Sequence, residues 1–431
     1  MSDRKDGSAG LHEYFETNPE TADKAFFGRE AHPDRRGFLR GAGLATMGAM
    51  VGAAIPFHRN MPTGLVPAAF AQENVLVGKD GLTLLNDRPV NAETPAHLLD
   101  DAITPTNRHF IRNNGTPPDS PDAATWKLTV DGLVDNPTDY SIADLKEKFE
   151  VVTMALAIEC GGNGRAAFDP PAKGNQWTLG AVACSEWTGV RLKDVLTAGG
   201  VKDNVIYTAH VGADEHLSGN PDKLPISRGM PIAKAMSDNV LIAWAQNGAD
   251  IHPMNGAPLR LVVPGWPGSL SHKWLTRIYL RDQVHDGPKM TGTSYRVPKY
   301  PVAPGTKVPK EDFEIIERMP VKSLITSPET GKAGGKELEV RGHAWSGDRT
   351  VDKVEVSMDF GATWQDADLN APINDGAWQN WRAKLTFPSN GYYEVWARAT
   401  DSEGDMQPFA IDWNPKGYLN NTMHRIAVTV A

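Results

Sequence analysis

Residues 157–165 read Ala157-Ile-Glu-Cys160-Gly-Gly-Asn-Gly-Arg165, in which a strand-like run ends at a cysteine and a glycine-rich turn follows. Glycines in the turn would let the backbone approach a bulky group closely. Arg165 would add a fixed positive charge and a planar fork of donors. A positive neighbour favours the thiolate form of a cysteine, and a thiolate is a soft ligand for transition metals. The segment predicts a metal-binding thiolate, but a buried inert cysteine also fits this spacing.

The chain before residue 319 mixes short strands with short helices. Between residues 100 and 318, strand patterns at 126–131 and 259–263 alternate with Gly/Pro turns and with helical patterns at 141–149 and 192–198. No regular alternation of strand and helix is present, which indicates an α+β fold.

The sequence pattern changes from mixed strands and helices to strands alone after a Pro-rich stretch at 300–309, which we interpret as a linker. Residues 337–344, 351–358, 381–387 and 392–398 alternate apolar with polar residues and are separated by turn residues. Strands at this spacing predict an antiparallel β-sandwich. We therefore expect a leader at 1–71, a first domain at 72–318 and a second at 319–431.

The leader has the features of an export signal. Asp34-Arg-Arg-Gly-Phe-Leu-Arg40 precedes a Gly/Ala-rich stretch at 41–55, and Ala69-Phe70-Ala71 offers a cleavage site. Twin arginines followed by Phe-Leu resemble a twin-arginine signal, a route that carries folded proteins, so we expect a periplasmic protein. An ordinary first helix is the alternative. We expect no membrane span, because about 18 apolar residues would be needed.

Charge and cysteine content narrow the possible partners. The 431 residues include 44 Lys and Arg against 53 Asp and Glu, a net charge of -9. No basic run follows the leader, so we expect no nucleic-acid partner. Cys160 and Cys184 are the two cysteines, and no Cys-x-x-Cys-His motif for covalent haem is present. In an exported protein these cysteines could also form a disulfide.

Several segments in the same order resemble the sulfite oxidase family, whose signature is a Cys-x-Gly-Asn-x-Arg turn. Besides that turn they are 110–114 (Phe-Ile-Arg-Asn-Asn), 184–196, 240–248, 258–265, 273–275 and 413–419. The resemblance covers nearly all of residues 100–431. It implies a sulfite-oxidase-type molybdopterin-binding domain followed by an immunoglobulin-like dimerisation domain. It also implies a molybdenum–molybdopterin cofactor, with no haem in this chain.

The resemblance implies roles for individual residues. Cys160 would be the metal ligand. The pterin would be held by Phe110, Arg112, Asn114, Cys160, Asn255, Arg260, Ser271 and Lys273. The substrate would be surrounded by Arg112, Arg165, Trp187, Tyr295 and Lys416, with Tyr300 as a rival to Tyr295. Trp187 could instead be core packing, Arg112 and Arg260 could be ion-pair or surface residues, and Lys273 could be solvated.

Three departures from the family pattern favour a different or larger substrate. Asn114 and Asn255 stand where histidine is usual, and Lys416 replaces an arginine, which keeps the charge but loses the bidentate fork. The amino-acid sequence of the cysteine turn is similar to that found in the sulfane dehydrogenase branch of the family. That likeness implies oxidation of sulfane sulfur on a sulfur-carrier protein, or of sulfite, by oxygen-atom transfer. A c-type cytochrome subunit would accept the electrons, in a homodimer within a hetero-oligomer.

Three alternatives stay open at this point. The first is a free-sulfite dehydrogenase with a soluble cytochrome acceptor. The second is a methionine sulfoxide reductase of related fold, against which residues 321–431 count because such enzymes usually have no C-terminal sandwich. The third is a non-catalytic exported binding protein with the sandwich as an adhesion module.

Overall fold

The computed structural model describes residues 76–431 of the chain. The predicted leader at 1–71, with its twin arginines and cleavage site, lies outside these residues. Within the described part of the chain, no helix is both long enough and apolar enough to cross a lipid bilayer.

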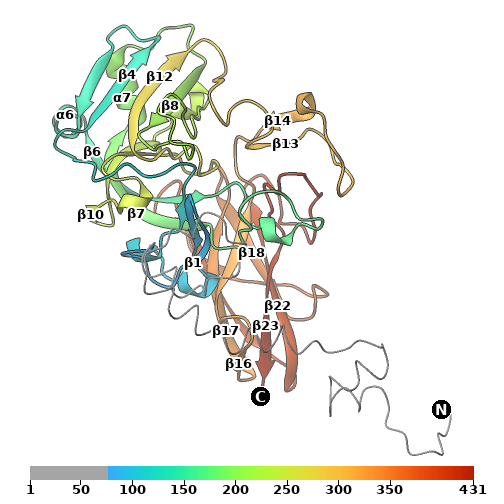
Figure 1. The fold of residues 1–431 in the computed structure, drawn as a ribbon. Helices are drawn as coiled ribbons and strands as arrows, with labels where there is room; N and C mark the ends of the chain where they lie inside the picture. The colour runs from blue at the N-terminus through green and yellow to red at the C-terminus, as the bar shows by residue number, and fades with distance from the viewer. Residues whose placement is uncertain (1–75) are drawn as a thin grey trace, which may run out of the picture. The chain divides into compact units, whose positions relative to one another are not determined.

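The first part of the described chain contains three sheets (Figure 1). One has the order β1 (Thr83–Asp87), β2 (Val90–Glu93), β3 (Ile111–Arg112). The second runs β10 (Ala249–Asp250), β9 (Leu241–Gln246), β7 (Val182–Arg191), β6 (Val151–Glu159), with β11 (Arg260–Val262) also paired to β9. The third runs β5 (Thr138–Ser141), β4 (Lys127–Gly132), β12 (Leu275–Arg281), β8 (Tyr207–Gly212).

Three short α-helices accompany these sheets, namely α6 (Ile142–Lys148), α7 (Leu192–Gly199) and α8 (Ile232–Ala235). Apolar residues of α6 and α7 pack with β4, β9 and β12 in one buried cluster. The strands expected near 126–131 and 259–263 and the helices expected near 141–149 and 192–198 are confirmed, with small differences in their ends.

We expected the Pro-rich stretch 300–309 to be a simple linker between two domains, but the structure shows a different role. It connects β13 (Arg296–Pro298) to β14 (Phe313–Ile315), which pair as an antiparallel ribbon. Proline has no N–H to donate and so is excluded from the middle of a sheet, but nothing prevents it from forming the loop of a ribbon. The chain then enters the next strand at Lys322, and the boundary at 318–319 remains a prediction.

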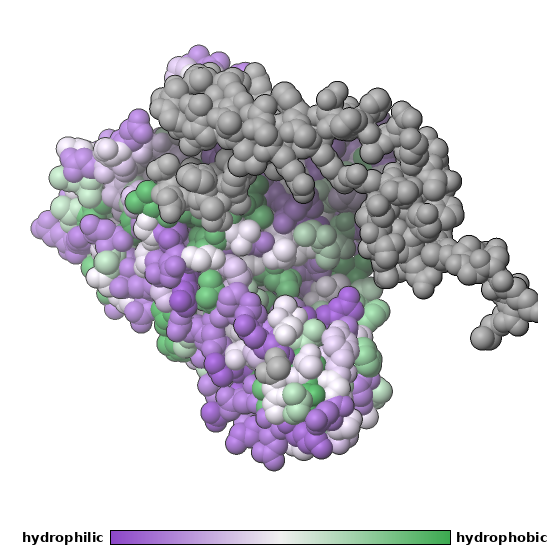
Figure 2. Space-filling view, turned by 60° about the horizontal axis from the view of Figure 1, so that its bottom comes forward, coloured by the Kyte–Doolittle hydropathy of each residue, from purple (hydrophilic) through white to green (hydrophobic). Residues whose placement is uncertain are grey.

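The remaining strands form the expected sandwich, drawn in orange to red in Figure 1. One sheet has the order β15 (Lys322–Ser327), β17 (Glu337–Trp345), β21 (Gln379–Thr386), β20 (Asp368–Leu369). The other runs β16 (Lys332–Gly334), β23 (His424–Val430), β22 (Gly391–Asp401), β18 (Val351–Ser357), β19 (Gln365–Asp366). Alternate residues of both sheets meet in one apolar core. On the face drawn in Figure 2, polar side chains predominate and apolar ones are scattered between them.

Helix α6 begins at a capping box. The Ser141 hydroxyl accepts a hydrogen bond from the Asp144 N–H at 3.0 Å, and the Asp144 carboxylate accepts one from the Ser141 N–H at 2.9 Å. This arrangement satisfies two backbone donors that the first helical turn would otherwise leave without partners. It fixes the helix start so that Ile142 and Leu145 reach the core.

Replacing the capping serine should weaken this part of the fold. We expect Ser141→Ala to lower the free energy of unfolding by about 1 kcal/mol, measured by urea denaturation of the full chain. Glu147→Ala on the same helix is the control, because Glu147 is exposed, and it should change stability by less than about 0.5 kcal/mol. Equal effects of the two substitutions would contradict a stabilising role for the cap.

Candidate active site

Strand β6 delivers Cys160 to a buried position. The last five residues of β6 are all buried, and Cys160 follows directly. The Cys160 N–H donates to Ala181 O at 2.9 Å, and its carbonyl accepts from the Asn163 N–H at 2.8 Å. Gly164 closes the turn in the left-handed region, with φ of 88°. The thiol therefore sits at the end of a strand that is fixed on both sides.

The second cysteine has a different environment. Cys184 lies in β7 with no exposed surface, and both cysteines are free thiols. Burial raises the pKa of the Cys184 thiol to about 12. The structure therefore does not support a disulfide, and Cys184 behaves as a small core residue.

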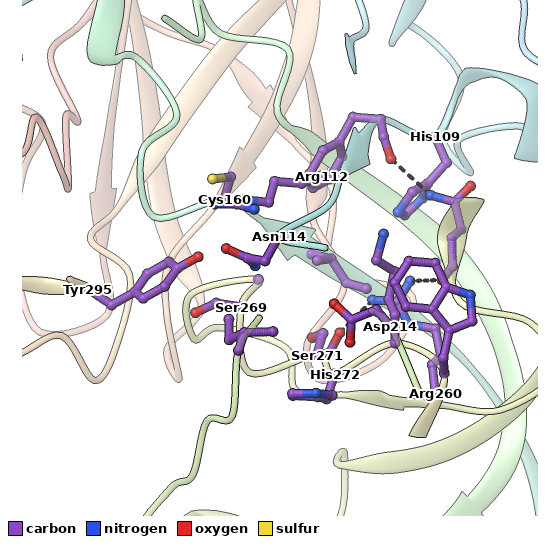
Figure 3. Close-up of a pocket in the computed structure, with 17 residues that line it drawn as sticks. His109, Arg112, Asn114, Cys160, Asp214, Arg260, Ser269, Ser271, His272 and Tyr295 are labelled. Atoms are coloured by element: carbon purple, nitrogen blue, oxygen red, sulfur yellow. Dashed lines mark hydrogen bonds between the residues drawn. The ribbon is translucent and has the colours of Figure 1, made fainter. Parts of the chain in front are cut away.

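Cys160 opens onto a cavity that gathers most of the predicted site (Figure 3). The predicted residues among those lining it are Phe110, Arg112, Asn114, Cys160, Asn255, Arg260, Ser271, Lys273 and Tyr295. They come from loops and strand ends far apart in the sequence. Asn114 replaces a usual histidine, and its side chain lies at the cavity wall together with the others.

One end of the cavity is strongly basic. Arg260 donates to Asn255 O at 2.6 Å and to Ser271 O at 2.9 Å. Lys273 donates to Met254 O at 2.8 Å and to the Asn113 side chain. Burial and then the nearby Arg260 charge hold the pKa of Lys273 well below its usual range. The hydrogen-bond donors of Arg260 and Lys273 thus meet neutral oxygens, which do not cancel the positive charge of the two side chains.

Lys79 lies next to this basic end, and sequence reasoning missed it. Its ammonium group donates to Thr106 O at 2.7 Å and to His109 O at 3.0 Å, and it also bonds the Asn255 side chain. Burial, and then Arg260, lower the pKa of Lys79 to about 7. Among the described residues that line the cavity, Asp214 is the one carboxylate. Burial raises its pKa to about 6, so it balances little charge at lower pH.

Several polar atoms in the cavity wall have no partner within residues 76–431. They are the Tyr295 and Ser269 hydroxyl groups and both ring nitrogens of His272. Burial, and then the cations around it, lower the pKa of His272 to about 3, so the ring is neutral. A buried polar group without a partner costs free energy, and in native proteins such groups usually meet a ligand or water. The wall is therefore suited to a polar ligand.

The thiol end of the cavity combines a cation with a phenol. Burial alone would lower the pKa of Arg112, but Tyr295, Cys160 and Tyr418 outweigh it and raise the pKa. The Tyr295 ring stacks on Tyr418 with centroids 5.7 Å apart, and the Tyr295 N–H donates to the Tyr418 hydroxyl at 3.2 Å. The Arg228 guanidinium lies 4.8 Å from the Tyr295 ring centroid. Tyr295 is thus held firmly with its hydroxyl directed into the cavity.

The rival tyrosine lies elsewhere. Tyr300 is 49% exposed, and its hydroxyl donates to Asp312 at 2.6 Å in the segment that connects β13 to β14. Of the two, only Tyr295 is among the described residues that line the cavity.

Three predicted substrate residues are not among the described residues lining the cavity. Arg165 donates to Lys416 O at 2.8 Å and to Asn175 O at 2.9 Å, so it ties loops together behind Tyr418. Trp187 is fully buried, and the Arg260 guanidinium lies 4.8 Å from its ring centroid. Lys416 is partly buried beside Arg165, and burial, with Lys173, Arg165 and Lys289, lowers its pKa. Their positions support the site rather than form its wall.

Sequence reasoning also missed His109, Asp214, His272 and Tyr418. Tyr418 and His272 lie inside or next to segments that the family resemblance covered, so that signal could have included them. Lys79 follows a turn that contains Gly78, Asp214 follows the end of β8, and neither belongs to a motif of its own. Hydrogen bonds to Thr106 O, His109 O and the Asn255 side chain bring Lys79 to the site, and Asp214 lies near enough to Lys273 for that charge to act on it.

Comparisons with known proteins agree with this geometry. Residues 114–289 match the oxidoreductase molybdopterin binding domain, and residues 313–431 match the Mo-co oxidoreductase dimerisation domain. Sulfite oxidase of Gallus gallus is 31% identical over 361 residues, which cover 80% of this chain and 77% of that protein. Mitochondrial sulfite oxidase of Homo sapiens is 31% identical over 401 residues, covering 88% and 71%.

A solved structure is similar over almost the whole of its length. The sulfane dehydrogenase SoxCD of Paracoccus pantotrophus superposes with a TM-score of 0.67 at 26% identity, covering 89% of this chain and 98% of that one. The chain therefore belongs to the sulfite oxidase family: it is a molybdenum oxidoreductase with a molybdopterin cofactor.

Proposed function

We propose that this chain is an exported enzyme that oxidises reduced sulfur by oxygen-atom transfer and passes the electrons to a c-type cytochrome. The substrate would be sulfane sulfur on a carrier protein, or sulfite. The observation that carries the proposal is the cavity itself, in which Cys160, Arg112 and Tyr295 meet at one end and Arg260 and Lys273 at the other. One end suits an anionic sulfur compound, and the other suits the phosphate of a pterin.

The residues of the cavity fit a molybdopterin. Arg260, Lys273 and Lys79 would balance the phosphate charge, which the neutral oxygens around them do not do. His272 and Ser269 offer nitrogen and hydroxyl groups without partners among the described residues, for the polar edge of the ring system. Cys160 would supply the protein's thiolate to the metal. When bound, the cofactor supplies the oxygen-atom transfer and takes up the electron pair.

The side chains at the thiol end would bind and orient the substrate. Arg112 carries a guanidinium that is always charged, so it attracts an anion beside Cys160. The Tyr295 hydroxyl can donate to a substrate oxygen without breaking a hydrogen bond to any described residue. Such preset donors stabilise developing negative charge without reorganisation. For sulfite, the oxidation consumes one water and yields sulfate, two protons and two electrons.

Similarity to known proteins supports two substrate classes. The superposition on sulfane dehydrogenase favours sulfane sulfur on a carrier. The identity to sulfite oxidases favours free sulfite with a soluble cytochrome acceptor. The match of residues 313–431 to a dimerisation domain supports a homodimer. The twin-arginine motif supports export of the folded chain to the periplasm.

Metal content tests the central assignment. We expect the full chain from a host that makes the cofactor to hold about one molybdenum per chain, and Cys160→Ser to lose most of it. Elemental mass spectrometry of purified folded protein measures this, and Cys184→Ser is the matched control that should keep the metal. Folded wild-type protein without molybdenum would overturn the proposal.

Anion binding by the cofactor-free protein should depend on pH. Sulfate stays a dianion across the neutral range, whereas Lys79, with a pKa of about 7, loses its charge as the pH rises. We expect sulfate, compared with chloride at equal ionic strength, to raise the melting temperature most below pH 7 and less at pH 8. Lys79→Met should flatten this dependence. A sulfate effect that grows with pH would contradict the assignment.

The two tyrosines give a paired test of catalysis. We expect Tyr295→Phe to lower kcat/KM about a hundredfold, because it removes one donor aimed at the substrate. Tyr300→Phe should leave kcat/KM unchanged. Steady-state reduction of a c-type cytochrome measures both variants, with sulfite and with carrier-bound sulfane sulfur, and the faster of these for the wild type identifies its substrate. Equal loss in both variants would rule out the role of Tyr295.

A further inference from the structure

We propose that Glu159, Lys322 and Trp345 form a clamp that holds the strand end carrying Cys160, so that the C-terminal sandwich sets the position of the metal ligand. The proposal rests on the role of Cys160 given above. The three are positioning residues, because they would act through Cys160 and not on the substrate.

The carboxylate of Glu159 is the centre of the clamp. It is almost fully buried, with 3% of its side chain exposed. One oxygen accepts from the Asn163 amide at 3.1 Å and forms an ion pair with Lys322. The other accepts from the Trp345 indole N–H at 2.9 Å. Both oxygens are therefore engaged, and the charge is balanced by a lysine that is itself 7% exposed.

The two external partners come from one edge of the sandwich. Lys322 is the first residue of β15 and Trp345 is the last of β17, and the two are direct partners in the β15–β17 register. Register fixes both side chains on one face, since a slip of one residue in either strand would turn that strand's side chain away from Glu159. The sandwich thus presents a prebuilt pair of donors to the cofactor domain.

The clamp encloses the cysteine turn from both sides. Glu159 directly precedes Cys160, and its own carbonyl accepts from Gly268 N at 2.6 Å. Asn163 follows Cys160 by three residues, and its N–H donates to Cys160 O at 2.8 Å. The Asn163 side-chain oxygen also accepts from Ala181 N at 3.1 Å. A displacement of the Glu159 carboxylate would therefore pass to the backbone on either side of the thiol.

The energetic reason is the buried charge. Removing one partner of a buried ion pair leaves the other uncompensated, and the structure must shift or admit water to relieve it. Groups that orient a metal ligand typically change metal affinity or activity by about 10- to 100-fold when they are replaced. Replacement of Lys322 should thus change the metal affinity or the activity.

A second buried lysine provides a comparison for the loss of a buried ammonium group away from Cys160. Lys234 of α8 forms an ion pair with Asp348 in the loop after β17, and its side chain is 6% exposed. Its described partners do not include residues of the cysteine turn. Lys322→Met and Lys234→Met both remove a buried lysine paired with a carboxylate, but Asp348 is 41% exposed and can be solvated, whereas Glu159 is 3% exposed and lies next to Cys160.

The test uses the molybdenum-loaded full chain. The electron paramagnetic resonance spectrum of the one-electron-reduced metal reports the geometry of its ligands. Metal content and melting temperature are measured on the same samples. We expect Lys322→Met to alter the spectrum and lower kcat by about 10- to 100-fold. Lys234→Met should lower only the melting temperature. Glu159→Gln combined with Lys322→Met should recover part of the spectrum, because neither charge is then left alone.

If Lys322→Met does not fold, Trp345→Phe removes one donor without stranding a charge and should still alter the spectrum. Wild-type spectra from loaded Lys322→Met or Trp345→Phe, with lowered melting temperatures, would reduce the clamp to a structural contact and overturn the proposal. A wild-type chain that holds no molybdenum would instead overturn the role of Cys160, and the clamp with it.

Discussion

The rest of the site depends on positive charge that the protein buries with one carboxylate in the described cavity wall to balance it. Arg260 and Lys273 both donate to neutral backbone or amide oxygens, and Asp214 is the one carboxylate among the described residues of the cavity wall. Burying a cation without a counter-charge is costly, and the lowered pKa of Lys273 reflects that cost. A bound phosphate would remove it. The cavity is therefore a site whose stability is completed by its ligand.

The same cations also organise the local structure. Arg260 bridges Asn255 O and Ser271 O, so a single guanidinium joins two loops that are separated in sequence by β11. Trp187 lies beneath it at 4.8 Å and keeps water from its inner face. Trp187 therefore packs against a cation of the cavity without forming the wall itself. A large aromatic ring under a buried cation supplies both packing and cation–π attraction.

Much of the fold could be predicted from local patterns. Apolar and polar residues alternate along β17, β18, β21 and β22. This alternation is a property of neighbouring residues, so it can be recognised without knowledge of tertiary contacts. The Cys160 turn could be predicted for the same reason, since its thiol, glycines and polar residues are contiguous.

The site residues outside the Cys160 turn could not be placed from sequence, because their positions depend on contacts between distant residues. Lys79 reaches Asn255 across 176 positions, and Arg165 turns away from the cavity to bond Lys416 O, 251 positions later. Spacing places Arg165 five residues after Cys160 but cannot say which way its side chain points. Likewise, spacing alone does not distinguish the tyrosines at 295 and 300. In the structure, Tyr295 has a left-handed backbone, with φ of 53°, and stacks on Tyr418, whereas Tyr300 is half exposed.

The sandwich is consequently more than a surface for pairing chains. It supplies Tyr418, which stacks on Tyr295, and Lys322 and Trp345, which complete the shell of Glu159. A chain cut after residue 318 would leave a buried carboxylate beside Cys160 without its cation and a cavity tyrosine without its support. The buried carboxylate of Glu159 and the backbone N–H of Tyr295 both find partners in residues that follow the predicted boundary.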